Sequence, residues 1–226
     1  MNFERPVTGE TTTFLPTDIR HIPFEDFLEG FDTPTTVHEK INSIKESGVN
    51  VEWTGVAKRQ DEHLTEIQNF GSFVFSKIDE SPKYSEGYGP CTGILVNVVM
   101  PDGKRVSFLS HQTPHAFSSD TFITKLKEHL DYFAGQQIIP GSTKVIVFGG
   151  RTPQASKDSA LTVWQYEKPM SKLSAILEEK GLLGSTTIMP PKSPNTRYAS
   201  RVYYDTSEDR LYLLESEVDI ARQYIN

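Results

Sequence analysis

The feature that most constrains the fold is a pair of apolar runs joined by a short turn. Residues 92–100 (TGILVNVVM) have the composition of a buried strand, and residues 105–110 (RVSFLS) read as its return strand. Between them, Pro101-Asp102-Gly103 is a strong turn signal, because proline fixes φ and glycine accepts a positive φ. The sequence therefore predicts an antiparallel hairpin that ends at His111.

The length of this turn decides which residues of the hairpin lie opposite one another. A three-residue loop pairs Met100 with Lys104 and places His111 opposite Gly93. Cys91 lies two residues beyond Gly93 and so shares the face of His111. Such diagonal neighbours have Cα atoms roughly 7–8 Å apart, and a modest twist or a bulge at Gly93 would bring the side chains together. A four-residue loop would instead place Cys91 and His111 on opposite faces.

Cysteine and histidine are a pair that nucleophilic catalysis uses. A free thiol has a pKa of about 8.5, and an adjacent imidazolium lowers it, which gives a reactive thiolate. The imidazole of His111 could then protonate a leaving nitrogen and activate water, and the Cys91 N–H could stabilise an oxyanion. Glycines before the cysteine, at 87 and 89, would let a substrate approach the backbone. The structural alternative is that a lone cysteine is more often a small buried hydrophobe.

The remaining pattern indicates further strands and helices. The predicted strands cover 51–56, 72–77, 141–150 and 186–189, with a closing hairpin of 201–204 and 210–214. The predicted helices cover 37–46, 61–69, 120–133 and 169–180. Residues 79–90 are rich in Ser, Pro, Gly and Tyr and are predicted to form a loop.

Composition excludes several classes of protein. The chain of 226 residues suits one substantial domain with extra elements. Its net charge of -7 argues against nucleic-acid binding, which needs a basic face. No apolar run is long enough for a membrane-spanning helix or a classical signal peptide, so we expect a cytoplasmic protein or one exported as an effector by another route. The single cysteine excludes an internal disulfide and a thiolate metal cluster.

The residues around the hairpin resemble the chemoreceptor glutamine deamidases (CheD). In that family a Gly-Ser-Cys segment opens a strand and a histidine ends the next, as Gly89-Pro90-Cys91 and His111 do here. The later order also agrees: a helix at 120–133, a strand that ends in Phe148-Gly149-Gly150, a helix at 169–180 and a hairpin with Arg201. The chain is similar, more distantly, to the catalytic domains of cytotoxic necrotizing factors, which share the cysteine–histidine core. The resemblance covers residues 71–216.

This resemblance implies an α+β fold with a β-sandwich-like core of mostly antiparallel strands flanked by helices. It divides the chain into an N-terminal extension or cap (1–70), a catalytic domain (71–216) and a C-terminal tail (217–226). The implied activity is hydrolysis of a protein glutamine side chain to glutamate and ammonia through a thioester. Such a hydrolase needs a partner protein that presents the glutamine, and it needs no metal or organic cofactor.

The family's functional residues are carried over position by position. Cys91 becomes the nucleophile and His111 the base. Ser85 takes the place of a threonine six positions before the cysteine, where it would orient His111. We also expect Tyr88, Gly89 and Gln112 to contact the substrate.

Two departures from the family leave the substrate open. Pro90 replaces the family's serine, and about seventy residues precede the matching region. A bacterial effector or toxin that acts on another protein fits the sequence as well as a role in chemotaxis. There are three alternatives: transamidation, a catalytically inactive protein-binding module on the same fold, and a cysteine peptidase. The sequence contains no peptidase motif.

Overall fold

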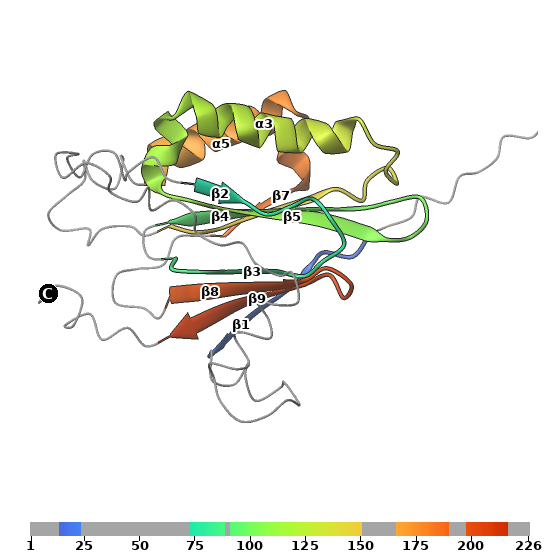
Figure 1. Ribbon diagram of the computed structural model, residues 1–226, viewed down its shortest axis with the longest axis horizontal. Coiled ribbons are helices and arrows are strands. Elements are labelled where there is room, and N and C mark those ends of the chain that lie inside the picture. The colour runs from blue at the N-terminus through green and yellow to red at the C-terminus, as the bar shows by residue number, and fades with distance from the viewer. Residues whose placement is uncertain (1–13, 24–72, 89–90, 151–165, 190–197, 217–226) are drawn as a thin grey trace, which may run out of the picture.

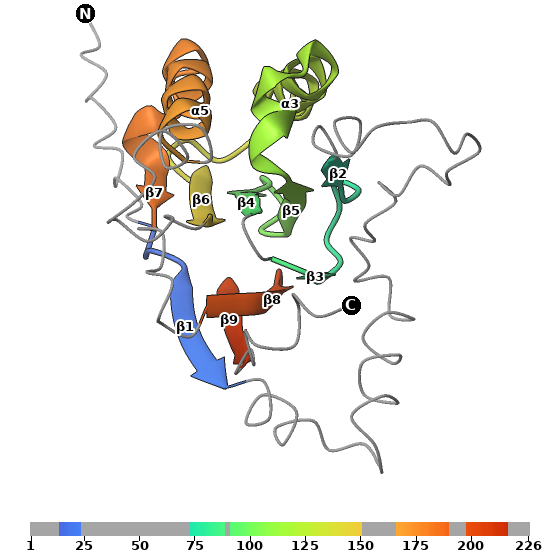
Figure 2. The same cartoon turned by 90° about the vertical axis from the view of Figure 1, so that its left-hand side faces the viewer.

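The computed structural model describes residues 14–23, 73–88, 91–150, 166–189 and 198–216. These residues stack in three layers, with a pair of helices above one sheet and a second sheet below it (Figure 1). The two helices, α3 (Asp120–Ala134) and α5 (Lys168–Glu179), lie side by side on the same face of the first sheet (Figure 2). The predicted α+β class with a β-sandwich-like core is therefore confirmed, with the described helices on one side of the sandwich.

The sheet under the helices, called the central sheet here, has the strand order β2-β5-β4-β6-β7. Its strands are β2 (Phe73–Phe75), β4 (Thr92–Val99), β5 (Arg105–Gln112), β6 (Lys144–Gly149) and β7 (Thr186–Ile188). All neighbours in it are antiparallel except β6 and β7.

The second sheet, called the outer sheet, has the order β1-β9-β8-β3. Its strands are β1 (Asp18–Pro23), β3 (Lys83–Glu86), β8 (Tyr198–Asp205) and β9 (Arg210–Ser216). Strand β1 runs parallel to β9, and the other pairs are antiparallel. Two short 3-10 helices, η3 (Pro114–Ser118) and η5 (Leu183–Ser185), complete the described elements.

The register of the β4–β5 hairpin is the one that a three-residue loop dictates. The backbone N–H of Met100 donates to the carbonyl of Lys104 at 2.7 Å, and Gly103 has the positive φ of 85° that the turn requires. Gly93 lies opposite His111, as predicted, and the pairing continues without a bulge from Thr92 to Val99. Cys91 and His111 therefore share one face of the central sheet.

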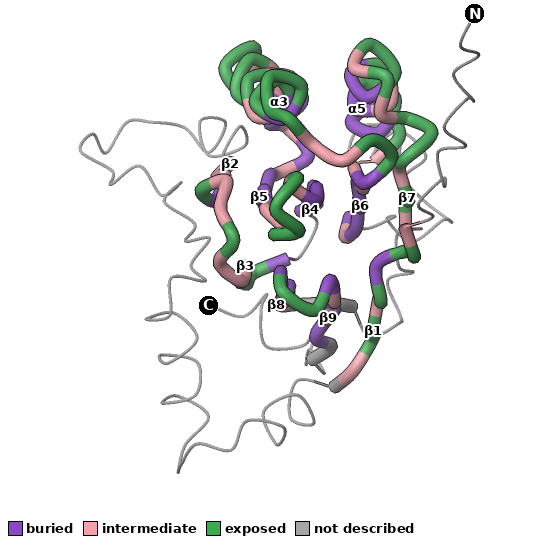
Figure 3. Tube along the Cα trace, turned by 90° about the vertical axis from the view of Figure 1, so that its right-hand side faces the viewer, coloured by how far each residue is buried: buried purple, intermediate pink, exposed green. Residues whose placement is uncertain are grey.

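Two hydrophobic cores form because both faces of β4 and β5 are covered. Alternate residues point to opposite faces, so Ile94, Val96 and Val98 pack under the helices while Leu95 packs against the outer sheet. In Figure 3, most buried segments lie in the strands of the two sheets, while the outer faces of the helices are exposed. All eight residues of β4 are buried, which explains its nearly continuous apolar sequence.

Local signals in the sequence account for both helices. The Ser119 side chain caps α3 by accepting a hydrogen bond from the backbone N–H of Phe122 at 3.4 Å. Pro169 lies in the first turn of α5, where its missing N–H costs nothing, and Gly181 follows the helix with a φ of 68°. Neither of these helices combines the length and the apolar run that a membrane crossing needs.

A buried carboxylate ties the two sheets together at the end of the sandwich away from Cys91. Asp209 lies in the β8–β9 turn with a φ of 54° and is 8% exposed. Its oxygens meet hydroxyl, amide and cationic groups from both sheets: Thr17 at 2.8 Å, Tyr204 at 2.9 Å, Asn97 at 3.4 Å, Lys144 at 2.5 Å and Arg105 at 3.5 Å. Charge pairing and hydrogen bonds together make the burial of this carboxylate tolerable.

Two strands lie where the sequence pattern predicts something else. Residues 83–86 form β3, inside the predicted loop, because they pair with β8. Residues 18–23 form β1, so part of the predicted N-terminal extension belongs to the outer sheet and not to a separate cap. The predictions for 37–46, 51–56, 61–69 and the tail at 217–226 lie outside the described residues.

Gly93 offers a test of the packing beneath the hairpin. A Cβ atom at this position would lie 2.2 Å from Cζ of Phe148, whose ring covers the glycine. We expect Gly93→Ala to lower the free energy of unfolding by about 1–3 kcal/mol, as overpacking does. Urea denaturation measures this, with Gly184→Ala as the control, because a Cβ there meets no atom within 4 Å.

A double variant tests whether the Phe148 ring is the cause of this destabilisation. Phe148→Leu should relieve part of the clash, so the combined cost of Gly93→Ala and Phe148→Leu should be smaller than the sum of the two single costs. Additive costs would show that the ring does not restrict this position.

Candidate active site

Three predicted residues from three parts of the chain lie on the inner faces at one end of the sandwich, and a hydrogen bond joins two of them, Ser85 and His111. Ser85 comes from β3 of the outer sheet, His111 from β5 of the central sheet, and Cys91 immediately precedes β4. The Ser85 hydroxyl lies 3.0 Å from Nδ1 of His111, and both residues are 1% exposed. This hydrogen bond crosses the space between the sheets, and it is the contact that the sequence predicted for Ser85.

The backbone of Cys91 is fixed by the end of β6. The N–H of Gly150 donates to the Cys91 carbonyl at 2.8 Å. Gly149 and Gly150 both have positive φ values, 79° and 78°, and a Cβ on Gly149 would lie 2.7 Å from the Cys91 oxygen. The double glycine is therefore required for the close approach of this strand end to the cysteine.

Burial keeps both members of the pair uncharged. Cys91 is 7% exposed and packs in the apolar cluster between the sheets with Tyr88 and Phe148. Burial raises the pKa of the Cys91 thiol to about 12 and lowers the pKa of His111 to about 3. At neutral pH the pair is therefore a thiol and a neutral imidazole, and not the thiolate and imidazolium that the sequence led us to expect.

The three residues expected to contact substrate fall in different places. Tyr88 is 2% exposed and stacks on His111, with ring centroids 3.9 Å apart and planes at 14°. Gln112 points to the helix side of the central sheet, opposite to His111, and its Nε2 donates to Thr92 Oγ1 at 3.0 Å. Gly89 lies outside the described residues.

The stacking of Tyr88 on His111 is a feature that the sequence analysis missed. A tyrosine three residues before the cysteine and next to Gly87 was the available signal. Gly87 has a φ of 88°, which turns the chain after β3 and folds Tyr88 back toward the sheet. The direction of this turn depends on backbone angles that the sequence pattern does not specify.

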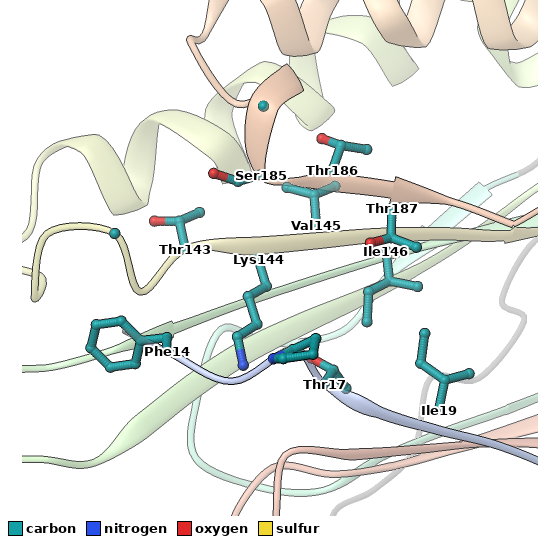
Figure 4. A pocket seen from close by; sticks show the side chains of 13 residues that line it. Phe14, Thr17, Ile19, Thr143, Lys144, Val145, Ile146, Ser185, Thr186 and Thr187 are labelled. Carbon is teal, nitrogen blue, oxygen red and sulfur yellow. The ribbon is translucent and has the colours of Figure 1, made fainter. Parts of the chain in front are cut away.

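A pocket of about 440 Å³ opens elsewhere, between β1 and the β6–β7 edge (Figure 4). Hydroxyl residues, Lys144 and apolar residues such as Ile19 and Ile146 line it, and none of the predicted site residues that the structure describes is among them. Lys144, the one charged side chain among the described lining residues, is paired with Asp209, and Thr17 donates to the same carboxylate. Among the described residues, the lining of this pocket therefore includes neither a cysteine nor a histidine.

Metal ligands are not gathered in the described part of the chain, where no three His, Cys, Asp or Glu side chains form a group that could hold an ion. The described side chains of the site contribute a thiol, an imidazole and a hydroxyl group.

Comparisons with known proteins find no model of a protein family and no curated sequence that matches this chain.

The two shifted pKa values predict a window of maximum stability. Because the folded protein holds a neutral imidazole, the unfolded chain binds a proton more readily below about pH 6.5, and stability falls as the pH drops toward 3. Because it also holds a neutral thiol, stability falls as the pH rises above about 8.5, the ordinary pKa of a free thiol, toward 12. Each limb has a limiting slope of about 1.4 kcal/mol per pH unit for one group.

Urea unfolding between about pH 4 and pH 10 measures both limbs. We expect His111→Gln to flatten the acid limb and Cys91→Ala to flatten the alkaline limb. Burial also lowers the pKa values of His115 and His129, so His129→Gln is the matched comparison for the acid limb. An acid limb that His111→Gln leaves unchanged would contradict a buried neutral imidazole.

Proposed function

We propose that this protein is a cysteine-dependent glutamine deamidase that hydrolyses the side-chain amide of a glutamine in another protein. The observation that carries the proposal is the hydrogen bond between Ser85 and Nδ1 of His111, on the sheet face that also carries Cys91. A base oriented by a third group and placed beside a nucleophile is the general arrangement of nucleophilic catalysis.

The proposed reaction begins with attack of the Cys91 sulfur on the carboxamide carbon while His111 takes the thiol proton. The Cys91 N–H would stabilise the oxyanion that forms. The C–N bond then breaks, the imidazolium gives its proton to the leaving ammonia, and a thioester remains. Water attacks the thioester as His111 removes its proton, the C–S bond breaks, and glutamate and the thiol result.

Ser85 has a defined part in this reaction. Its hydroxyl engages Nδ1 of His111. The other ring nitrogen, Nε2, is therefore the atom that would exchange protons with sulfur, ammonia and water. A hydroxyl can donate to or accept from this nitrogen, so it suits both the neutral and the protonated ring.

A protein-binding module without catalysis is the second candidate, and the burial of Cys91 favours it. Only 7% of this residue is exposed, and a thiol with a pKa raised to about 12 is unreactive by itself. The two candidates differ in whether His111 accelerates reactions of the sulfur.

Ammonia release from acetyl-Gly-Gln-Gly amide tests the proposed reaction. We expect conversion of glutamine to glutamate without added amine, with oxygen from ¹⁸O-labelled water in the product. Cys91→Ser should lose activity by a factor of about 10³ or more, and His111→Ala by about 10²–10⁴. The control His115→Ala should retain activity. Formation of an amide with added amine, in place of glutamate, would indicate a transglutaminase.

Iodoacetamide, itself a small carboxamide, tests the pair without a glutamine substrate. At about pH 7 the native protein should be alkylated at Cys91 about tenfold faster than His111→Ala, because the imidazole accepts the thiol proton. Equal and slow alkylation, together with no ammonia release, would establish the binding module instead.

The contribution of Ser85 is tested by two variants. Ser85→Ala should lower kcat by up to about 100-fold by releasing the imidazole from its orientation, with little change in KM. Ser85→Thr keeps the hydroxyl and should retain most of the activity. Equal loss in both variants would show that the serine contributes packing and not orientation.

A further inference from the structure

The Tyr88 side chain is held against the strand that carries His111. Its ring lies parallel to the imidazole at 3.9 Å, and its hydroxyl donates to the carbonyl of Ser110, the preceding residue, at 3.5 Å. On another side its ring meets Phe148, with centroids 5.5 Å apart and planes at 56°. A side chain in contact with three neighbours and 2% exposed has little freedom to turn outward toward a substrate.

One contact alone does not fix an imidazole. The hydrogen bond from Ser85 restrains the direction of Nδ1, but the ring can still tilt about that bond. A parallel aromatic ring restrains the tilt, because stacking is lost when the planes turn away from each other. Ser85 therefore restrains the direction of the His111 ring, and Tyr88 restrains its plane.

We propose that Tyr88 is a positioning residue that sets the plane of the His111 imidazole and shields one face of it from water, and not a residue that contacts substrate. The catalytic role of Tyr88 in this inference rests on the proposed function, in which the His111 imidazole acts as the base. The geometry of the stack is independent of that function.

Removal of the ring should change the environment of the imidazole. Water would then reach the exposed face, and the desolvation that lowers the pKa of His111 would weaken. Besides Tyr88, the titratable groups that face the same space between the sheets are Cys91, Tyr204 of β8 and Lys83 of β3, which pairs with Asp79. The next charged residue of β3, Glu86, pairs with Arg201 of β8 at 3.5 Å. None of these changes in a Tyr88 variant, so a shift in the His111 titration would report on the lost ring.

Tyr88→Leu and Tyr88→Phe separate stacking from the hydroxyl. The imidazole of His111 is titrated by NMR in each variant, and kcat and KM for ammonia release are measured against pH. We expect Tyr88→Leu to raise the pKa of His111, to move the acid limb of the pH–rate profile upward with it, and to lower kcat by up to about 100-fold with little change in KM. Tyr88→Phe keeps the stack and should stay close to the native protein in every measurement.

Two further variants serve as a control and as a replacement. Leu213→Ala destabilises the same apolar cluster from β9 and should leave the titration of His111 unchanged. Tyr88→Met fills similar space without an aromatic plane, and it replaces Tyr88→Leu if that variant does not fold. An unchanged His111 titration in Tyr88→Leu or Tyr88→Met, or an equal shift in Tyr88→Phe, would overturn the proposal. Because the titration needs no activity, absence of ammonia release in the native protein would reject the deamidase alone.

Discussion

The backbone pairing between β4 and β5 determines which side chains of these two central strands face the helices and which face the outer sheet. Side chains alternate across a strand, so a slip of one residue would turn each of them to the other face. Depending on which strand shifts, either Ile94 and Val96 of β4 would leave the core under the helices, or His111 of β5 would leave the space between the sheets. The bonds of the turn, from Met100 N–H to Lys104 and from Gly103 N–H to Met100, hold the register that prevents this.

A second constraint is that the two sheets are tied together by polar contacts at both ends. At one end Asp209 collects donors from strands of both sheets, and at the other Ser85 reaches across to His111. Between these ends the interior is apolar, with Leu95, Ile146 and Leu211 fully or almost fully buried. Hydrophobic packing is not directional, whereas buried hydrogen bonds require a partner at a set position, so the polar ends fix how the sheets are placed on each other.

Local sequence signals were sufficient for the elements that carry their own pattern. The hairpin, both helices and the strands around Val145 and Val202 were predicted close to their observed positions. Strand β3 was missed because Lys83–Glu86 is short and polar, and it forms only because β8 offers a partner more than a hundred residues away. Strand β1 depends in the same way on β9, at the other end of the chain.

The candidate site could also be predicted only in part. The shared face of Cys91 and His111 follows from the turn, which the sequence specifies, and the structure also shows the predicted contact of Ser85. Gln112 was expected to contact the substrate because it directly follows His111, where the strand was predicted to end. The strand continues through Gln112, which therefore points to the opposite face. Once strand β5 has its observed end, simple alternation gives this result.

Burial of the site determines whether the thiol proton stays on Cys91 or moves to His111, and this affects the reaction proposed for the site. With pKa values of about 12 for Cys91 and about 3 for His111, separate ionisation of both groups costs on the order of 10 kcal/mol at neutral pH. Attraction between two unit charges about 4 Å apart recovers about 4 kcal/mol at an effective dielectric constant of 20. The resting pair is therefore neutral. For the proposed reaction this means that proton transfer must accompany formation of the C–S bond, when the negative charge passes on to the carboxamide oxygen. A site of this kind would protect its thiol until a carboxamide is bound beside it.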